Sequence, residues 1–284
     1  MPGFPGAGYT ELVQRVGALG GFAPAYDAFA ASIVHAYEPA RRVLTSYTGN
    51  LVRLRRASDN AEANFGYLAN GDLNVAAIAA WAGGASYVVT IYDQGIGDDI
   101  TMAVAANQML YVANARNGHA GMLFDGTDYL QGAFTTGGAL SQPYNLLFVA
   151  KLGAGLADDG VIYFLTDGDD AANEVKFFKH KDPIPDAWRF ASGNSIEFAN
   201  ADSNWHVWAA LFSGAASLIR SNAVQVGAGN TGAENADGFT LGAENNGANP
   251  WKGYATSAII CDPSLSVAQL AAMEIAMNAY WGVY

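Results

Sequence analysis

The sequence predicts a mainly β protein: an antiparallel β-sandwich of two sheets, or jelly roll, with a short N-terminal helical arm and a C-terminal helix. Short runs of β-branched and aromatic residues recur at roughly 8–12-residue spacing between residues 144 and 261, as is typical of such folds. The spacers hold Gly, Asn, Asp and Pro, the residues that form turns. Charged residues make up only 14% of the chain, which has 33 glycines. The composition therefore indicates a turn-rich protein with a neutral polar surface.

Length and charge limit the number of domains and the classes of partner. The chain has 284 residues, and all-β domains commonly reach ~200–250 residues, so we expect one sandwich over residues 41–284 behind an arm of residues 1–40. The net charge of −12 argues against nucleic acid as a partner. No apolar window is long enough to span a membrane. The N-terminus lacks the basic and apolar segments of a signal peptide, so we expect synthesis in the cytoplasm without one.

Three helices are expected in the N-terminal third of the chain. Residues 1–8 are rich in Pro and Gly and should form a flexible arm. Apolar residues at helical spacing predict helices over residues 9–19 and 25–37. A third helix is predicted over residues 73–81, and the glycine at Gly83 should end it.

The segment Ser86–Asp99 joins an apolar strand to a polar turn. Its strand is rich in β-branched and aromatic residues, and two glycines follow it. Tyr92, Asp93, Gln94 and Asp98 gather polar side chains at one rim of the expected sandwich. Such a turn either binds a ligand, which makes these four side chains candidate carbohydrate-binding residues, or simply ends a strand.

The rest of the chain reads as strands followed by one helix. Ser266 and Gln269 form a capping-box pair, and apolar residues follow them at helical spacing. The single cysteine, Cys261, lies in an apolar run and should be a buried thiol. The strands are expected at 144–152, 160–165, 174–180, 187–191, 195–199, 205–213, 216–220, 223–226, 238–242 and 255–261.

Five of the 14 basic residues lie between residues 41 and 56. Such a cluster either pairs with the protein's own surplus carboxylates or forms a docking surface for an acidic partner subunit. These residues are Arg41, Arg42, Arg53, Arg55 and Arg56.

A neutral sugar is bound by aromatic faces and by polar side chains that read its hydroxyls. Trp188 and Trp251 flank polar turns and are the candidate aromatic contacts, with Asn245 and Asn246 beside the second of them. Trp205 lies within a strand and is expected in the core.

One acidic turn is a candidate metal site. Calcium prefers hard oxygen ligands, which Asp167, Asp169 and Asp170 could supply. The alternative is a solvated hairpin turn, which the lack of a complete calcium-loop signature favours. No other cofactor is expected.

Several motifs together give a family resemblance. They are Ile91-Tyr92-Asp93-Gln94, Phe124-Asp125-Gly126-Thr127-Asp128, Asn204-Trp205-His206-Val207-Trp208, Gly242-Ala243-Glu244-Asn245-Asn246 and Tyr47-Thr48-Gly49 with Leu51 to Arg56. On these motifs, residues 40–284 resemble the concanavalin A-like or laminin-G-like lectin superfamily, and most closely the catalytic domain of the α-L-arabinofuranosidase B family. The resemblance implies a two-sheet sandwich with a sugar-binding groove.

The resemblance also implies a pair of catalytic carboxyl groups. Glu174 matches the position of the family's nucleophile and Glu244 that of its acid, where the family has Asp. Two features depart from the family. Its paired cysteines have no counterpart near residues 161–166, and the turn after Gln94 is altered.

Three functions follow. The first is a carbohydrate-binding, receptor-recognition subunit, a spike or fibre at the surface of a phage-like particle or gene transfer agent. Its ligand would be cell-surface or capsule polysaccharide, and residues 1–56 would contact other particle proteins. The alternatives are an arabinofuranosidase-like glycoside hydrolase and an architectural decoration protein. The sequence leaves homo-oligomerisation open.

Overall fold

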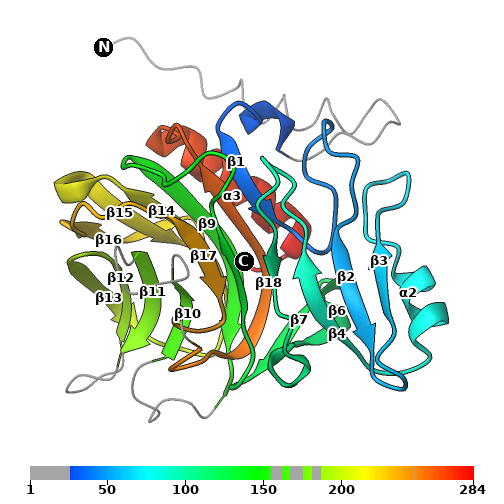
Figure 1. Ribbon diagram of the computed structural model, residues 1–284. Helices are drawn as coiled ribbons and strands as arrows, with labels where there is room; N and C mark the ends of the chain where they lie inside the picture. The colour runs from blue at the N-terminus through cyan, green and yellow to red at the C-terminus, as the bar shows by residue number, and fades with distance from the viewer. Residues whose placement is uncertain (1–25, 155–161, 167–174, 181–186, 246) are drawn as a thin grey trace.

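A computed structural model describes residues 26–154, 162–166, 175–180, 187–245 and 247–284 (Figure 1). In this part of the chain, 18 β-strands are hydrogen-bonded into one antiparallel sheet. None of its helices is long and apolar enough to cross a membrane. The helical segments are η1 (Asp27–Phe29), α2 (Val75–Ala82), η2 (Ala105–Asn107), η3 (Gly214–Ala216) and α3 (Val267–Trp281).

The strands fall into two groups along the chain. The first nine are β1 (Ile33–Tyr37), β2 (Val52–Arg56), β3 (Glu62–Phe65), β4 (Ser86–Ile91), β5 (Ile100–Thr101), β6 (Leu110–Arg116), β7 (His119–Asp125), β8 (Leu130–Ala133) and β9 (Tyr144–Leu152). The second nine are β10 (Ile162–Thr166), β11 (Val175–His180), β12 (Ala187–Ser192), β13 (Ser195–Asn200), β14 (Trp205–Phe212), β15 (Ser217–Ser221), β16 (Val224–Gly229), β17 (Gly238–Leu241) and β18 (Lys252–Cys261).

The sheet forks at β4. Tyr87 near the start of β4 pairs with Leu110 of β6, whereas Thr90 near its end pairs with Thr101 of β5. One branch continues through β6, β7, β18, β9, β14, β15 and β16, and the other through β5, β8, β17, β10, β11, β12 and β13. The prediction of a two-sheet, concanavalin-like jelly roll is therefore wrong. Hydrogen bonding runs from one layer into the other and encloses the core in a nearly closed, barrel-like sheet.

The N-terminal segment differs from the prediction. The helix expected over residues 25–37 is a single turn, η1, followed by strand β1. Strand β1 pairs with β18, with Ile33 opposite Cys261 and Tyr37 opposite Ala258. The prediction of a helix is wrong here because sheet pairing outweighs local helical spacing. The expected helix over residues 9–19 lies outside the described residues.

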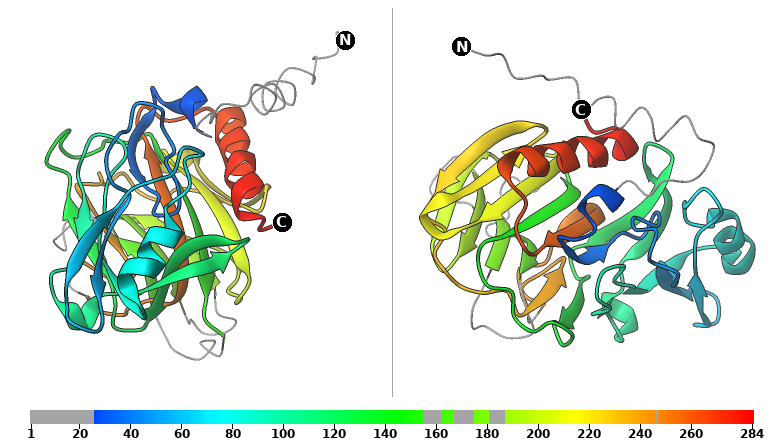
Figure 2. Two further views of the ribbon diagram at one scale, coloured as in Figure 1. Left: turned by 90° about the vertical axis from the view of Figure 1, so that its right-hand side faces the viewer. Right: turned by 90° about the horizontal axis from the view of Figure 1, so that it is seen from above.

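Two apolar cores hold the sheet. The inner core lies between the branches and contains an aromatic cluster in which Phe148 packs 4.8 Å from Phe164 and 4.7 Å from Phe177, ring centre to ring centre. The outer core lies between one outer face of the sheet and α3 (Figure 2). There Met273 and Met277 cover β9, β14 and β18. Burial raises the pKa of the Cys261 thiol in this core to about 12.

Local signals explain the elements that the sequence predicted. From β9 onward, each expected strand is present with its ends within three residues of the prediction. The expected helix over 73–81 is α2, which ends at Gly83 in the left-handed conformation. The capping box of Ser266 and Gln269 opens α3 as expected.

Candidate functional site

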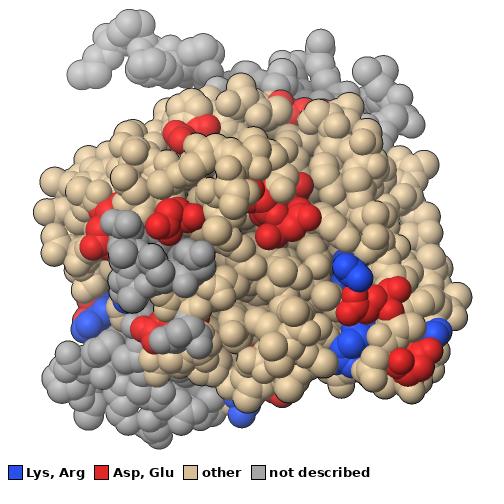
Figure 3. Space-filling view, in the orientation of Figure 1, with Lys and Arg blue, Asp and Glu red and all other residues tan. Residues whose placement is uncertain are grey.

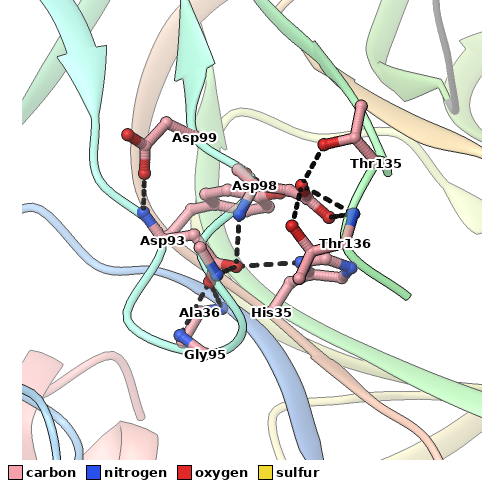
Figure 4. Close-up of polar contacts among 10 residues, drawn as sticks. His35, Ala36, Asp93, Gly95, Asp98, Asp99, Thr135 and Thr136 are labelled. Carbon is pink, nitrogen blue, oxygen red and sulfur yellow. Dashed lines mark hydrogen bonds and ion pairs between the residues drawn. The ribbon is translucent and has the colours of Figure 1, made fainter. Parts of the chain in front are cut away.

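The turn after β4, residues 92–99, is called the Asp93 turn here. The side chain of Asp93 is fully buried. It accepts hydrogen bonds from Nδ1 of His35 at 2.9 Å and from the backbone N–H of Ala36 at 2.7 Å (Figure 4). The backbone N–H groups of Gly95 and Gly97 also donate to it, at 2.8 and 3.0 Å. Both oxygens of this carboxylate are therefore used inside the protein.

Asp98 and Tyr92 of the same turn also bond within the chain. Asp98 accepts hydrogen bonds from the hydroxyls of Thr135 and Thr136 at 2.7 and 2.9 Å (Figure 4). Because Thr135 and Thr136 follow β8, Asp98 fastens the turn to the second branch of the sheet. The Tyr92 hydroxyl donates to Oδ1 of Asn64 at 2.8 Å, and its ring stays half-buried.

Gln94 joins the turn to the segment that follows β1. Its Oε1 accepts from the backbone N–H of Val43 at 2.8 Å. Its Nε2 donates to the carbonyls of Glu38 and Arg41, both at 2.9 Å. The side-chain oxygen and both N–H groups of Gln94 thus bond to backbone groups. Gln94 therefore fixes the position of residues 38–43 relative to the Asp93 turn.

The surroundings of Asp93 favour its charged form. Burial alone would raise the pKa of Asp93, but the hydrogen bonds from His35 and Ala36 outweigh it and lower the pKa below its ordinary value. The turn also lies close against β1. A Cβ at Gly95 would meet the carbonyl oxygen of Val34 at 2.0 Å, so only glycine fits there.

Both predicted sugar-binding tryptophans lie in the inner core. Trp188 is 2% exposed and Trp251 is 1% exposed. The ring centre of Trp188 lies 5.4 Å from that of Phe177, and Trp251 lies 5.0 Å from Phe164. The structure thus places both indoles among core aromatics, where they are not exposed to a ligand in solvent.

Five predicted site residues lie outside the described residues. They are the catalytic candidate Glu174, the sugar-binding candidate Asn246, and the calcium candidates Asp167, Asp169 and Asp170. Within the described ranges, no group of three or more His, Cys, Asp or Glu side chains could hold a metal ion.

The other catalytic candidate, Glu244, projects from a closed loop between β17 and β18. Its backbone N–H donates to the carbonyl of Ala248 at 3.0 Å, and the N–H of Gly247 donates to the Glu244 carbonyl at 2.8 Å. Its Oε2 accepts from Nδ2 of Asn249 at 3.0 Å. Glu244 and its neighbour Asn245 are half-buried. The loop therefore holds one carboxyl in a defined orientation with access to solvent.

Sequence reasoning missed a cavity of about 510 Å³ beside the turn that follows β7. Its wall includes Arg55, which donates from Nε to Oε1 of Gln108 at 2.6 Å and lies 4.8 Å above the ring of Tyr87. Asp125 and Asp128 complete it. Burial and then the neighbouring Asp125 raise the pKa of Asp128 to about 6. The only sequence signal was a pair of carboxylates three residues apart in a turn.

The Asp128 turn and the Glu244 loop are neighbours. A Cβ at Gly242 would lie 2.9 Å from the carbonyl oxygen of Asp128, and one at Gly247 would lie 2.8 Å from the ring of Tyr129. This part of the sheet therefore brings the oriented carboxyl of Glu244 near Asp128, a carboxyl whose pKa burial raises to about 6.

The arginines of residues 41–56 bind within the chain. Figure 3 shows basic and acidic surfaces interleaved over β2 and β3. Arg53 pairs with Glu62 and Arg56 with Asp59, each at 2.6 Å, as one of the two readings predicted. The remaining three lie over aromatic rings: Arg41 over Tyr280 at 3.8 Å, Arg42 over Tyr67 at 4.7 Å and Arg55 over Tyr87 at 4.8 Å.

Comparisons with known proteins identify this fold. A family model for the catalytic domain of α-L-arabinofuranosidase B matches residues 24–133, less than half of the chain. An arabinofuranosidase complexed with arabinofuranosyl-α-1,2-xylobiose superposes with a TM-score of 0.72 at 17% identity, over 92% of this chain and 65% of that one. A GH54 α-L-arabinofuranosidase soaked with a cyclic sulfate inhibitor gives 0.71 at 16% identity over the same shares. No curated protein sequence matches.

A more distant match is the ligand-binding domain of botulinum neurotoxin serotype D in complex with N-acetylneuraminic acid. Its TM-score is 0.53 at 10% identity, over 91% of this chain and 56% of that one. The chain thus has the fold of arabinofuranosidase catalytic domains and spans 65% of the length of the arabinofuranosidases that it matches.

These matches correct one prediction. The matching family and the arabinofuranosidase structures are glycoside hydrolases, and they give no support to a virion structural protein of a phage or gene transfer agent. That prediction is wrong. It rested on the expected N-terminal arm and the lack of a signal peptide. The altered Asp93 turn was the reason for preferring binding over catalysis, and in the structure the side chains of this turn bond within the protein.

Proposed function

We propose that this protein is a glycoside hydrolase that acts on α-L-arabinofuranosides, with Glu244 as one of its two catalytic carboxyls. The observation that supports this most directly is the oriented carboxyl of Glu244 on a closed loop of an arabinofuranosidase fold. The competing sugar-binding hypothesis took Trp188 and Trp251 as its aromatic contacts, and their rings are in the core. The proposed substrate class is polysaccharide that carries arabinofuranosyl groups.

Glycoside hydrolysis needs one carboxylic acid to protonate the leaving oxygen and one carboxylate to act from the other side of the sugar. We assign the acid role to Glu244. Asn249 holds its Oε2, which leaves Oε1 to donate a proton. We assign the role of the second carboxylate to Glu174, which directly precedes β11 in the chain. This chemistry needs no metal.

Two substrates test these roles. In Glu244→Gln, kcat on arabino-oligosaccharides should fall by ~10²–10⁴-fold, the usual contribution of a general acid. The loss should be smaller on 4-nitrophenyl α-L-arabinofuranoside, because 4-nitrophenolate leaves without being protonated. In Glu174→Gln, both substrates should lose activity alike, since the attacking carboxylate is needed for each.

Glu197→Gln is the matched control. Glu197 pairs with Arg189 at 2.6 Å on the exposed surface of β13, so its replacement should leave kcat on both substrates unchanged. Equal activity of Glu244→Gln and wild type on both substrates would remove Glu244 from the mechanism.

A second candidate function is binding of arabinofuranosides without cleavage. The family match favours it in one respect, because the match ends at residue 133, before Glu174 and Glu244. This function predicts that wild-type protein binds arabino-oligosaccharides in calorimetry and releases no arabinose on prolonged incubation. Release of arabinose by wild type, lost in Glu244→Gln, would decide for the hydrolase.

A further inference from the structure

We propose that a cavity at the C-terminal end of α3 binds an acidic sugar, a saccharide that carries a carboxylate. The cavity has a volume of about 470 Å³, and its wall includes Arg116, Lys151, Asp202, Trp205 and His206. None of these residues lines the cavity beside Asp128. Glu244, the described carboxyl of the proposed hydrolase, is not among its lining residues either, so the inference does not depend on the proposed function.

A row of three side chains crosses three adjacent strands here. Lys151 of β9 pairs with Trp205 of β14 on one side and with Tyr254 of β18 on the other. Directly opposed residues of neighbouring strands share a face of the sheet, so the three side chains lie together. The ring centres of Trp205 and Tyr254 are 5.7 Å apart. All three residues are half-buried.

The row continues the sheet face that α3 covers. Val149 and Val207, two residues further along β9 and β14, are fully buried in the outer core. Beyond the C-terminal end of α3 the helix no longer covers this sheet face. The indole of Trp205, which the sequence placed in the core, is therefore partly accessible to solvent. Aromatic rings at such a position can pack against the C–H face of a sugar.

Positive charge dominates the cavity wall. Within the described residues, the side-chain ammonium of Lys151 has no hydrogen-bond or ion-pair partner. Arg116 donates from Nε to the carbonyl oxygen of Trp281 at 3.2 Å and from a second nitrogen to that of Gly282. It therefore caps α3, and no carboxylate among the described residues forms an ion pair with it. Two cations thus line one cavity of a protein whose net charge is −12.

The one carboxylate in the wall is already paired. Oδ1 of Asp202 lies 2.7 Å from Nε2 of His206, and Asn204 donates to Oδ2 at 3.0 Å. Because the carboxylate accepts, Nε2 of His206 carries the proton. Its Nδ1 lies 2.8 Å from the hydroxyl oxygen of Ser221. These contacts hold the imidazole in place in the cavity wall. The ammonium of Lys151 therefore remains available to donate hydrogen bonds to a ligand.

This combination selects the ligand. The ammonium of Lys151, supported by the charge of Arg116, suits a carboxylate, and the rings of Trp205 and Tyr254 suit the sugar that carries it. A small inorganic anion would use only the cations, and a neutral sugar only the rings. A uronic acid uses both.

The test compares oligogalacturonate with its methyl ester, which keeps the sugar rings and lacks the charge. Calorimetric titration of the full chain should show the acid binding about fivefold more tightly than the ester, the scale of a partly exposed ion pair. Lys151→Met should reduce the affinity for the acid to that for the ester and leave the affinity for the ester unchanged. Lys252→Met, at an exposed lysine of β18 outside the cavity, should change neither.

Trp205→Ala should weaken binding of the acid and the ester together. Trp205 also packs against the outer core, so Trp205→Ala could fail to fold. In that case the result for Lys151→Met alone tests the proposal. The proposal is overturned if the acid does not bind, if acid and ester bind equally, or if Lys151→Met keeps the wild-type preference. Arabinofuranoside hydrolysis, measured on the same variants, should be unaffected, so failure of one proposal leaves the other standing.

Discussion

At the scale of single residues, Asp93 shows how one carboxylate can hold distant segments. It accepts hydrogen bonds from four residues described above and from the N–H of Asp98 at 3.2 Å. Asp93→Asn turns one acceptor oxygen into a donor that faces other donors. We expect it to lower the free energy of unfolding by about 3 kcal/mol or more, measured by urea denaturation at pH 7.

Asp99→Asn is the control for this prediction. Among the described residues, Oδ1 of Asp99 accepts from the N–H of Asp93 at 2.8 Å, and the residue is exposed. Asparagine keeps this acceptor oxygen, so the substitution should cost less than about 1 kcal/mol. The pKa of Asp93 is lowered in the folded state. Its contribution is therefore complete above about pH 4 and is lost as the pH falls further. Equal stability of Asp93→Asn and wild type at pH 7 would contradict this account.

The sequence identified the Asp93 turn as important and left its role open. Its hydrogen-bond donors in His35 and Ala36 lie 58 and 57 residues away in the chain. The sequence around Asp93 therefore could not predict these hydrogen bonds. Asp128 was missed for a related reason. The shift in its pKa comes chiefly from burial, which depends on neighbouring strands. Glu244 was found only through resemblance, because nothing in its local sequence distinguishes it from an ordinary turn residue.

At the scale of elements, prediction succeeded where local signals agree with the pairing. Strands β9 to β18 have suitable residues between turn residues, and α3 has both a capping box and an apolar face. It failed at β1, whose apolar residues also fit a helix. Pairing with β18 decides between the two states there.

A buried carboxyl between β1 and α3 predicts how the stability of the protein depends on pH. Glu38 follows β1 and is fully buried. Burial raises its pKa from about 4.5 to about 7, although Arg41 acts in the opposite direction. Between these values the folded state holds a proton that the unfolded state has lost. Stability should therefore fall by up to about 3 kcal/mol as the pH rises from 4.5 to 7.

Glu38→Gln should remove this dependence. Urea denaturation at pH 8 should show the variant to be more stable than wild type, and at pH 4.5 the two should match. Glu274→Gln is the contrasting control on α3. Glu274 is fully buried but pairs with Arg220 at 2.8 Å, so its replacement should destabilise the protein at both pH values. An unchanged pH profile in Glu38→Gln would show that Glu38 is not the group responsible.

At the scale of the whole molecule, the fork at β4 makes the sheet one unit. The sequence predicted most strands but not this closure, because it depends on one strand edge being shared by β5 and β6. The closure also links the two ends of the chain. Strand β18 pairs with β1 and β7, and β17 pairs with β8.

This closure predicts that the part matched by the family model cannot fold alone. A fragment of residues 26–133 would lack β9, β17 and β18, which pair with or cover its strands, and would expose the apolar faces of β1, β7 and β8. We expect poor dispersion in its proton NMR spectrum and no near-ultraviolet circular dichroism. Adding a fragment of residues 134–284 should restore both signals to those of the full chain. A well-dispersed spectrum from residues 26–133 alone would mean that the first branch is an independent domain and that the sheet does not fold as one unit.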